Sequence, residues 1–361
     1  MQVQHSPAWT MPVLAFCLSL IFSLVLAPTL GLVAYQQYDF WLLWAVSMLF
    51  LALPLTILEI ALAKRVKNSP LQGFMQLTRD ADRSTRWRIL SWAAALFVPL
   101  LAGGMLYFAA QQVQQQFALT LAPSLVVLAL LVFAVALSCI PRLILFILMA
   151  IATLALVVIG IVTQPEATWQ WTAIEFHEWA KVVTLIVVTG GLGLGVYWQS
   201  ALQAAKTKQA ATPIALPICL AQALGLGIFA FVSDITSSLQ AIALCFAVLA
   251  LAALLLQLVR EQLLARHIAL PIQALILLLP LLVWAVPQSG MVLFPFMVIC
   301  GLLLVLGYAI FVGWLMKISH LRKSIQFSSE AIYNLWRIMV RIVVPLSVVL
   351  ALLGWLLAWV G

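Results

Sequence analysis

The sequence predicts an all-α polytopic membrane protein with eleven transmembrane helices. Hydrophobic residues make up 66% of the 361 residues and charged residues only 8%, whereas soluble domains carry about 25% charged residues. The mean hydropathy is +1.18. Such a chain has too little polar surface to fold as a soluble enzyme or a nucleic-acid-binding domain, and it is too apolar to be disordered.

Eleven segments have the length and composition of a bilayer-spanning helix, which needs about 20 mostly apolar residues. Turn-forming or charged residues separate one segment from the next. The first segment lacks a basic start and exceeds the length of a signal peptide, so we expect it to be retained as a helix. The segments lie at about residues 11–35, 40–63, 87–117, 119–139, 142–163, 179–204, 213–234, 237–260, 268–286, 290–317 and 336–360.

The basic residues support this count and orient the chain. With a cytoplasmic N-terminus, the cytoplasmic loops and adjoining span ends carry 17 of the 18 Lys and Arg residues, and only Lys181 lies outside. Because Lys and Arg near span ends set orientation, the sequence predicts an inner-membrane protein with its C-terminus outside. The net charge of +8 therefore reports topology and requires no nucleic-acid partner. The 17 cytoplasmic residues are Lys64, Arg65, Lys67, Arg79, Arg83, Arg86, Arg88, Arg142, Lys206, Lys208, Arg260, Arg266, Lys317, Arg322, Lys323, Arg337 and Arg341.

Enzymatic chemistry and bound cofactors are not expected. The five cysteines fall within apolar segments, and the four histidines are scattered without the spacing of metal ligands. The chain contains no P-loop, no H-E-x-x-H and no C-x-x-C motif. We therefore expect a non-enzymatic protein without a metal centre or cofactor.

One carboxylate lies well inside a predicted span, away from its ends. Glu59 is in the second span, about one helical turn before Lys64 and Arg65. It is either a carboxylate near the inner interface that pairs with those cations or a carboxylate that faces an internal pathway. Ionisable groups inside spans are costly to bury and are usually functional, so both interpretations stay open.

The sixth span contains a run of glycines, TGGLGLGVYWQS at residues 189–200. A glycine costs about 1 kcal/mol relative to alanine in a helix interior. The run is either a small-residue face for helix packing or a broken helix whose backbone groups line a binding site. In the third span, Gly103 and Gly104 predict close helix packing, and Tyr107 is a candidate for lining a cavity.

The order of several motifs resembles the neurotransmitter:sodium symporter family. Residues 54–65, PLTILEIALAKR, resemble the P-L-x-x-x-E-x-A-x-G-x-R segment of its second helix. The sixth span resembles the broken sixth helix of that family at Trp179, Gly191, Leu192, Gly193 and Ser200. Near the C-terminus, Trp336, Arg341 and Pro345 keep the family's W-x4-R-x3-P spacing. The resemblance runs over nearly the whole chain.

This resemblance implies the leucine-transporter fold in a single domain over residues 1–361. Spans 1–5, about 11–163, and spans 6–10, about 179–317, would be inverted repeats, with residues 336–360 as an extra helix. In that family the substrate and sodium ions lie between the broken helices 1 and 6, beside helices 3 and 8. The residues that fall at these positions are Thr189, Gly191, Leu192 and Gly193 at the break, Leu106 and Tyr107 in helix 3, Ser23 in helix 1, and Glu59 as the carboxylate that braces the unwound segments.

The chain departs from the family where sodium binds. The first helix reads SLIFSLVLAP in place of G-x-G-N-x-W-R-F-P, and keeps only Pro28 with Ser23 near the asparagine position. The sodium ligands of helix 8 align with Leu255 and Leu256, and the asparagine of helix 7 aligns with Leu216. A hard cation needs several oxygen ligands. We therefore expect neither sodium site to be intact, and no other metal site.

Two functions follow as expectations. The first is a secondary transporter of a small solute such as an amino acid, working by alternating access, with proton coupling through Glu59 or no coupling. The second is a non-transporting relative that acts as a membrane scaffold or regulatory subunit, whose basic loop at residues 64–88 docks a partner or anionic lipid. Expected partners are the bilayer, the solute, and a second copy or another membrane protein. An unwound first helix would favour transport, and a continuous, leucine-filled one the scaffold.

Overall fold

The structure is a computed structural model that describes residues 7, 9–31, 37–118, 120–163, 168–205, 210–232, 234–316 and 319–360. These residues form helices joined by short connections and contain no β-strand beyond one isolated bridge between Gln37 and Gln170. The all-α expectation is confirmed. Eight helices of the described part are long and apolar enough to cross a membrane, and each of the eleven predicted segments contains helix.

The first half of the chain holds five of the predicted spans. They are α1 (Thr10–Leu30); α2 (Tyr38–Ser47), η1 (Met48–Ala52) and α3 (Leu53–Val66) in one continuous span; η2 (Thr85–Arg88) with α5 (Ile89–Phe117); α6 (Pro123–Leu137); and α7 (Arg142–Thr163). Between the second and third spans lies α4 (Pro70–Asp80), a helix in a segment that we expected to be a loop. It buries Leu71, Phe74 and Leu77, whose spacing of three places them on one helical face.

The second half holds the remaining six predicted spans and one short connecting helix. They are α8 (Phe176–Val187), α9 (Val196–Ser200) and α10 (Leu202–Ala205) in the sixth; α11 (Thr212–Phe229); α12 (Ser238–Ala265); α13 (Leu270–Leu282) with η3 (Val283–Ala285); α14 (Gly290–Ile310) with η4 (Phe311–Leu315); and α16 (Glu330–Ile338), η5 (Met339–Val343) and α17 (Val344–Val360). The connecting helix α15 (Ser319–Ile325) precedes α16. Three of the cations expected on the cytoplasmic side, Lys206, Lys208 and Lys317, lie outside the described residues.

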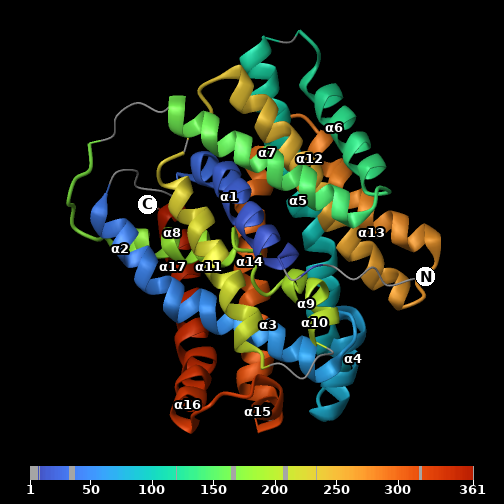
Figure 1. Ribbon diagram of the computed structural model, residues 1–361, viewed down its shortest axis with the longest axis vertical. Coiled ribbons are helices and arrows are strands. Elements are labelled where there is room, and N and C mark those ends of the chain that lie inside the picture. Colours follow the sequence, from blue (N-terminus) through green and yellow to red (C-terminus); the bar gives the residue numbers. More distant parts are fainter. Residues whose placement is uncertain are drawn as a thin grey trace.

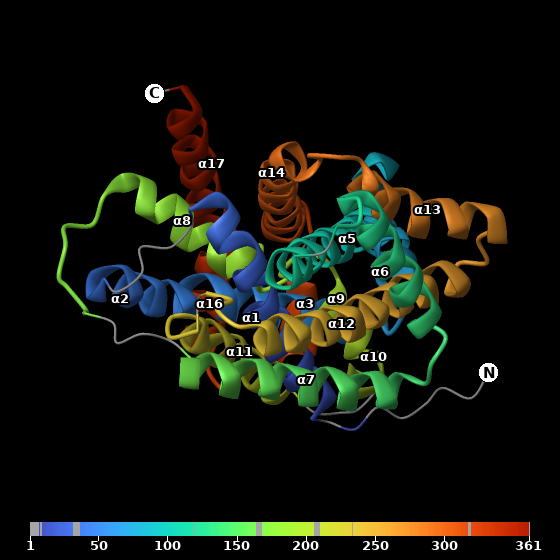
Figure 2. The same ribbon diagram turned by 90° about the horizontal axis from the view of Figure 1, so that it is seen from above.

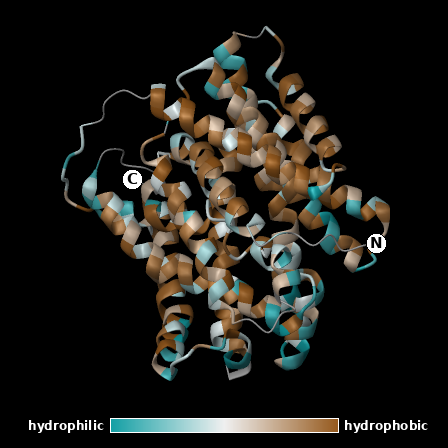
Figure 3. Ribbon diagram, in the orientation of Figure 1, coloured by the Kyte–Doolittle hydropathy of each residue, from teal (hydrophilic) through white to brown (hydrophobic). Residues whose placement is uncertain are grey.

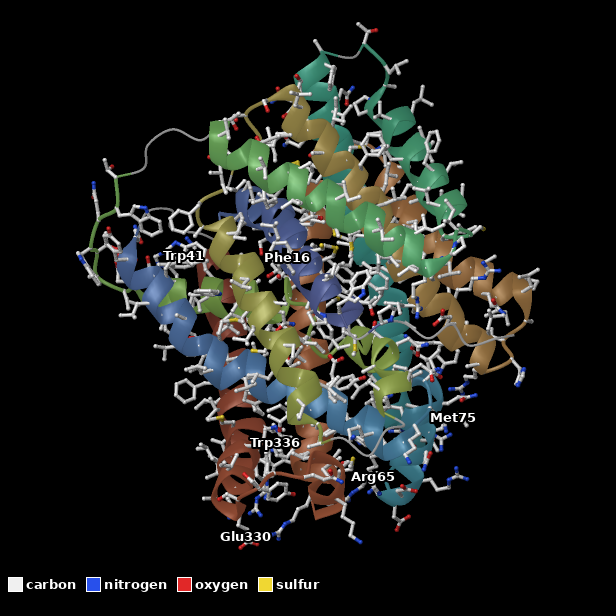
Figure 4. All side chains as sticks on the ribbon, in the orientation of Figure 1. Phe16, Trp41, Arg65, Met75, Glu330 and Trp336 are labelled. Carbon is white, nitrogen blue, oxygen red and sulfur yellow. The ribbon has the colours of Figure 1, made fainter. Side chains whose placement is uncertain are left out.

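Two of the spans contain a widened, π-helical turn shortly before a proline. The turn η1 (Met48–Ala52) precedes Pro54, and η5 (Met339–Val343) precedes Pro345. A proline in a helix lacks the N–H that bonds to the preceding turn, and its ring clashes with the carbonyl four residues earlier. A wider turn relieves that clash and lets the helix continue. The Trp336 indole bonds to the Pro54 carbonyl at 3.1 Å, which ties the last span to the second; Figure 4 labels Trp336 at this junction.

The helices pack around α12, which contacts α5 and α7 along its length. Figures 1 and 2 show this arrangement, with α1 beside α11 near the centre of the molecule. Gly225 of α11 lets α1 approach closely, since a Cβ on this residue would lie only 2.4 Å from Ser19 Oγ of α1. The interior of α1, from Leu14 to Ala27, is almost entirely buried, so this helix is enclosed by the rest of the fold.

Candidate functional site

The sixth span is a broken helix. Helix α8 ends at Val187 and α9 begins at Val196, and the eight residues between them, 188–195, are non-helical and buried. Gly191, Gly193 and Gly195 have φ angles of +63°, +72° and +71°, in the left-handed region that other residues adopt only with strain. Of the two interpretations of the glycine run, the structure therefore shows the break and not a regular packing face.

The break is in direct contact with neighbouring helices. A Cβ on Gly191 would lie 2.6 Å from Leu18 of α1, and a Cβ on Gly193 would lie 2.7 Å from Val305 of α14. Glycine is thus required twice over at these positions, for its backbone conformation and for the lack of a side chain. As a result, residues 188–195 lie between α1 and α14, where the fold buries them.

Glu59 binds the free backbone groups at the break. Its side chain is 1% exposed; Oε1 accepts a hydrogen bond from the Gly193 N–H at 2.5 Å and Oε2 accepts one from the Trp198 N–H at 3.3 Å. The N–H groups of a first helical turn have no partner within the helix, and the helix dipole favours a negative charge there. Glu59 thus faces the break and caps α9.

A second polar group lies on the other side of the break. The Gly190 carbonyl accepts hydrogen bonds from the Tyr197 hydroxyl at 2.7 Å and from Gln222 Nε2 at 3.1 Å. Gln222 comes from α11 and is buried; its Oε1 and the buried Tyr308 hydroxyl of α14 have no hydrogen-bond partner among the described residues. The Tyr308 hydroxyl lies close to Gly195, 3.7 Å from where its Cβ would be. Buried polar atoms are rarely left unpaired, so these two are the groups at the break available to a solute or water.

Two of the expected site hydroxyls bond to carbonyls four residues earlier in the chain. Thr189 Oγ1 donates to the Leu185 carbonyl, and Ser23 Oγ donates to the Ser19 carbonyl at 2.6 Å. Both side chains are fully buried. A hydroxyl that bonds back to the preceding turn is satisfied without a ligand. Leu192, which lies between Gly191 and Gly193, is also buried.

The third span contacts a different part of the structure through Tyr107. Its ring packs against Trp284 and Phe294, with centroids 5.4 and 6.1 Å away, and so faces the junction of η3 and α14. A Cβ on Gly103 would lie 2.4 Å from Trp284 Cδ1, and one on Gly104 would lie 3.0 Å from Trp284 Cζ2. The two glycines therefore leave the space that the Trp284 indole fills. Leu106, the aligned neighbour of Tyr107, is fully buried.

The first helix is not broken. Helix α1 runs without interruption over 21 residues, with Pro28 in its last turn. The resemblance implied two broken helices around the site, and the structure has one. At the positions where the family that the motifs resemble has helix-unwinding glycines, this chain has leucines and other residues that keep their helical backbone bonds.

The expected sodium positions do not offer the oxygen ligands that the ion requires. Leu255 and Leu256 of α12 are buried and contribute only hydrocarbon. Leu216 lies on the surface of α11, 44% exposed, and so cannot face an internal site; the polar residue that α11 contributes is Gln222. Among the described residues, no three His, Cys, Asp or Glu side chains form a group that could hold a metal ion.

Comparison with known proteins identifies the fold. No protein-family model matches the chain, and no curated protein matches it by sequence. A solved structure does match: the crystal structure of MhsT in complex with L-phenylalanine, with a TM-score of 0.58, 15% sequence identity, and coverage of 95% of this chain and 98% of that chain. The likeness spans both chains almost completely, so the chain has the leucine-transporter fold that the order of its motifs predicted.

Proposed function

We propose that the protein is a secondary transporter of a small solute of the amino-acid class, working by alternating access around residues 188–195. The observation that carries this proposal is the buried break itself, with its backbone groups held by Glu59 and Gln222. Broken helices at the centre of such folds supply backbone groups to substrates. The matching MhsT structure was solved with L-phenylalanine, which supports an amino acid as the solute.

The surroundings of the break favour an apolar solute. Leu18, Leu192 and Val305 are buried around it, and the partnerless polar atoms are Gln222 Oε1 and the Tyr308 hydroxyl. Solute sites are mostly apolar, with a few polar groups that fix orientation. We expect an amino acid with a hydrocarbon or aromatic side chain to be preferred over a charged one.

Transport is proposed to be independent of sodium. Leu255 and Leu256 supply hydrocarbon where the related family supplies hydroxyl oxygens. Coupling to protons would have to involve Glu59, the buried carboxylate at the break. Both of its oxygens already accept hydrogen bonds from backbone N–H groups. A proton added to either oxygen would therefore point at another hydrogen-bond donor, which is unfavourable. Glu59 therefore acts as a brace in this proposal.

The test is uptake by the purified full chain in liposomes. Vesicles loaded with unlabelled L-phenylalanine or L-leucine should accumulate the same labelled amino acid by exchange, equally in sodium and in choline buffers. Sodium-dependent exchange would contradict the proposal that Leu255 and Leu256 leave no sodium site. In the Glu59→Gln variant, exchange that remains but loses its pH dependence would assign proton coupling to Glu59. A parallel loss of exchange and thermal stability would support the brace.

A non-transporting scaffold is the second candidate, and the continuous α1 is the observation that favours it. In that case α1 would stay a rigid rod and leave half of the expected site unformed. The same exchange assay discriminates the two. Absence of exchange for all twenty amino acids, together with co-purification of a stoichiometric membrane partner, would favour the scaffold.

A further inference from the structure

We infer that Arg88 and Arg266 form a binding site for the phosphate of an anionic phospholipid headgroup. The site lies at the junction between η2 and α5, where α4 packs beside both of them and close to the C-terminal end of α12. Arg88 is the last residue of η2, and Arg266 follows α12 directly. Both side chains are half-buried. The inference does not depend on whether the protein transports a solute.

Both guanidinium groups are held in place by α4. Arg88 Nε donates to Thr78 Oγ1 at 3.0 Å, and Arg266 Nη1 donates to the Leu71 carbonyl at 3.1 Å. The Arg266 guanidinium also stacks on the Trp92 ring, 4.9 Å from its centroid. Each bond uses one N–H of a five-donor group. Among the described residues no other hydrogen-bond acceptor contacts these two guanidiniums, so their remaining N–H groups can bind an anion.

The two cations meet the same short stretch of helix, because the Trp92 ring on which Arg266 stacks lies one helical turn after Arg88. Among the described residues neither has an ion-pair partner, whereas Arg65, Arg142 and Arg322 pair with Asp80, Glu261 and Glu330. Burial, followed by repulsion from Arg88, lowers the pKa of Arg266 from its usual value. Placing like charges together is unfavourable unless an anion joins them. A phosphate, which accepts forked bonds from Arg, meets this need.

The surroundings point to a lipid as the source of the phosphate. Ile89, next to Arg88, is 68% exposed, and Leu96 is 42% exposed, so the first two turns of α5 carry exposed apolar side chains. Trp87 and Trp92 are half-buried beside it, as is typical of side chains at the boundary between headgroups and hydrocarbon. Hydrophilic residues gather at the end of the molecule that carries α4 (Figure 3), where Figure 4 labels Met75 and Arg65. A headgroup bound by Arg88 and Arg266 would place the first carbons of its acyl chains beside Ile89.

The experiment compares lipids and variants on the purified full chain in detergent. Phosphatidylglycerol should raise the Tm of the wild type by on the order of 3 °C, with no comparable rise from phosphatidylcholine. The Arg88→Gln, Arg266→Gln double variant should lose most of this rise. The matched control is Arg86→Gln with Arg83→Gln, which removes two exposed cations from the same segment and should keep it. Arg266→Lys keeps the positive charge but cannot form the two parallel hydrogen bonds of a guanidinium, so we expect an intermediate rise in the Tm.

Three results would overturn the inference. Inorganic phosphate that raises the Tm as much as phosphatidylglycerol would show a site for free anions. An equal loss in the control double variant would show diffuse surface attraction. No selective rise in the wild type would show that no such site exists. Should the double variant fail to fold, native mass spectrometry of the wild type and of Arg266→Lys decides: retained phosphatidylglycerol should be at least about threefold lower in Arg266→Lys, and equal retention would contradict the site.

Discussion

The Glu59 carboxylate accepts the backbone N–H of Gly193 at 2.5 Å, a bond between residues 134 positions apart. It joins the second span to the break in the sixth. The N–H groups at the start of α9 would otherwise be buried without partners, and each such group costs about 1–3 kcal/mol. The sequence places a single carboxylate deep in a predicted span, and the structure uses it to stabilise the single broken helix.

Glu59→Gln should therefore destabilise the fold. The amide keeps the shape of the side chain but turns an NH2 donor toward one of the two backbone N–H groups. We expect a loss of about 2–3 kcal/mol, seen as a lower Tm in detergent, and a larger loss for Glu59→Ala. Glu330→Gln is the control because its pair with Arg322 is exposed and worth little. Equal Tm values for the Glu59 and Glu330 variants would refute the brace.

Gly193→Ala should disrupt the break, whereas Gly227→Ala should not. Gly193 has φ +72° and a Cβ there would lie 2.7 Å from Val305, while a Cβ on Gly227 meets nothing within 4 Å. We expect Gly193→Ala to cost about 1–3 kcal/mol and Gly227→Ala to stabilise α11 by about 0.5–1 kcal/mol. Thermal unfolding of the two variants in the same detergent measures both. A Gly193→Ala variant as stable as wild type would show that the turn can relax.

Trp284→Phe should loosen the contact between α5 and the end of α13. The indole is fully buried against Gly103, and its Nε1 donates to the Leu100 carbonyl at 2.9 Å. The substitution removes that bond and leaves a cavity, at a cost of about 2–4 kcal/mol. Trp171→Phe is the matched control because Trp171 is exposed. The relevant measurement is the Tm, and a Trp284→Phe value close to that of Trp171→Phe would contradict the packing role.

Glu261→Gln should free the segment that follows the break. Glu261 of α12 pairs with Arg142 of α7 at 2.8 Å and accepts a bond from Gln199 of α9 at 3.2 Å. This links the short helix after the break to two long helices. Because Glu261 is partly exposed, we expect a modest effect: hydrogen exchange at residues 196–200 faster by about threefold.

The control for that experiment is Glu330→Gln, which leaves α9 untouched. Exchange at residues 196–200 should then match the wild type. If Glu261→Gln also left it unchanged, the contact with Gln199 would not hold α9 in place.

Much of the fold follows from apolar segment length and motif order. All eleven predicted segments contain helix, and the glycine run marks the break. Helix α4 was not predicted because the cations of residues 64–88 are typical of a cytoplasmic loop, although Leu71, Phe74 and Leu77 have helical spacing. Topology with a cytoplasmic N-terminus stays a prediction.

The site was harder to predict than the fold, because alignment by motif does not say which way a side chain points. Gln222 was overlooked, although a glutamine inside an apolar span is a signal in itself. The aligned residue Leu216 proved to lie on the outer face of the same helix. Thr189 and Ser23 have the right chemistry, but their hydroxyls bond to backbone carbonyls four residues earlier. Only coordinates separate these cases.

An unbroken α1 beside a broken sixth span has a mechanical consequence. Helix α1 is one continuous helix, whereas the sixth span has a joint at residues 188–195, where the helix is interrupted. Any change between states should pivot at that joint and carry α9 and α10 with it, while α1 keeps its helical geometry. A protein with two joints can open at either end by the same motion in reverse. If the protein transports a solute as proposed, a single joint would make opening toward the two sides of the membrane two different motions.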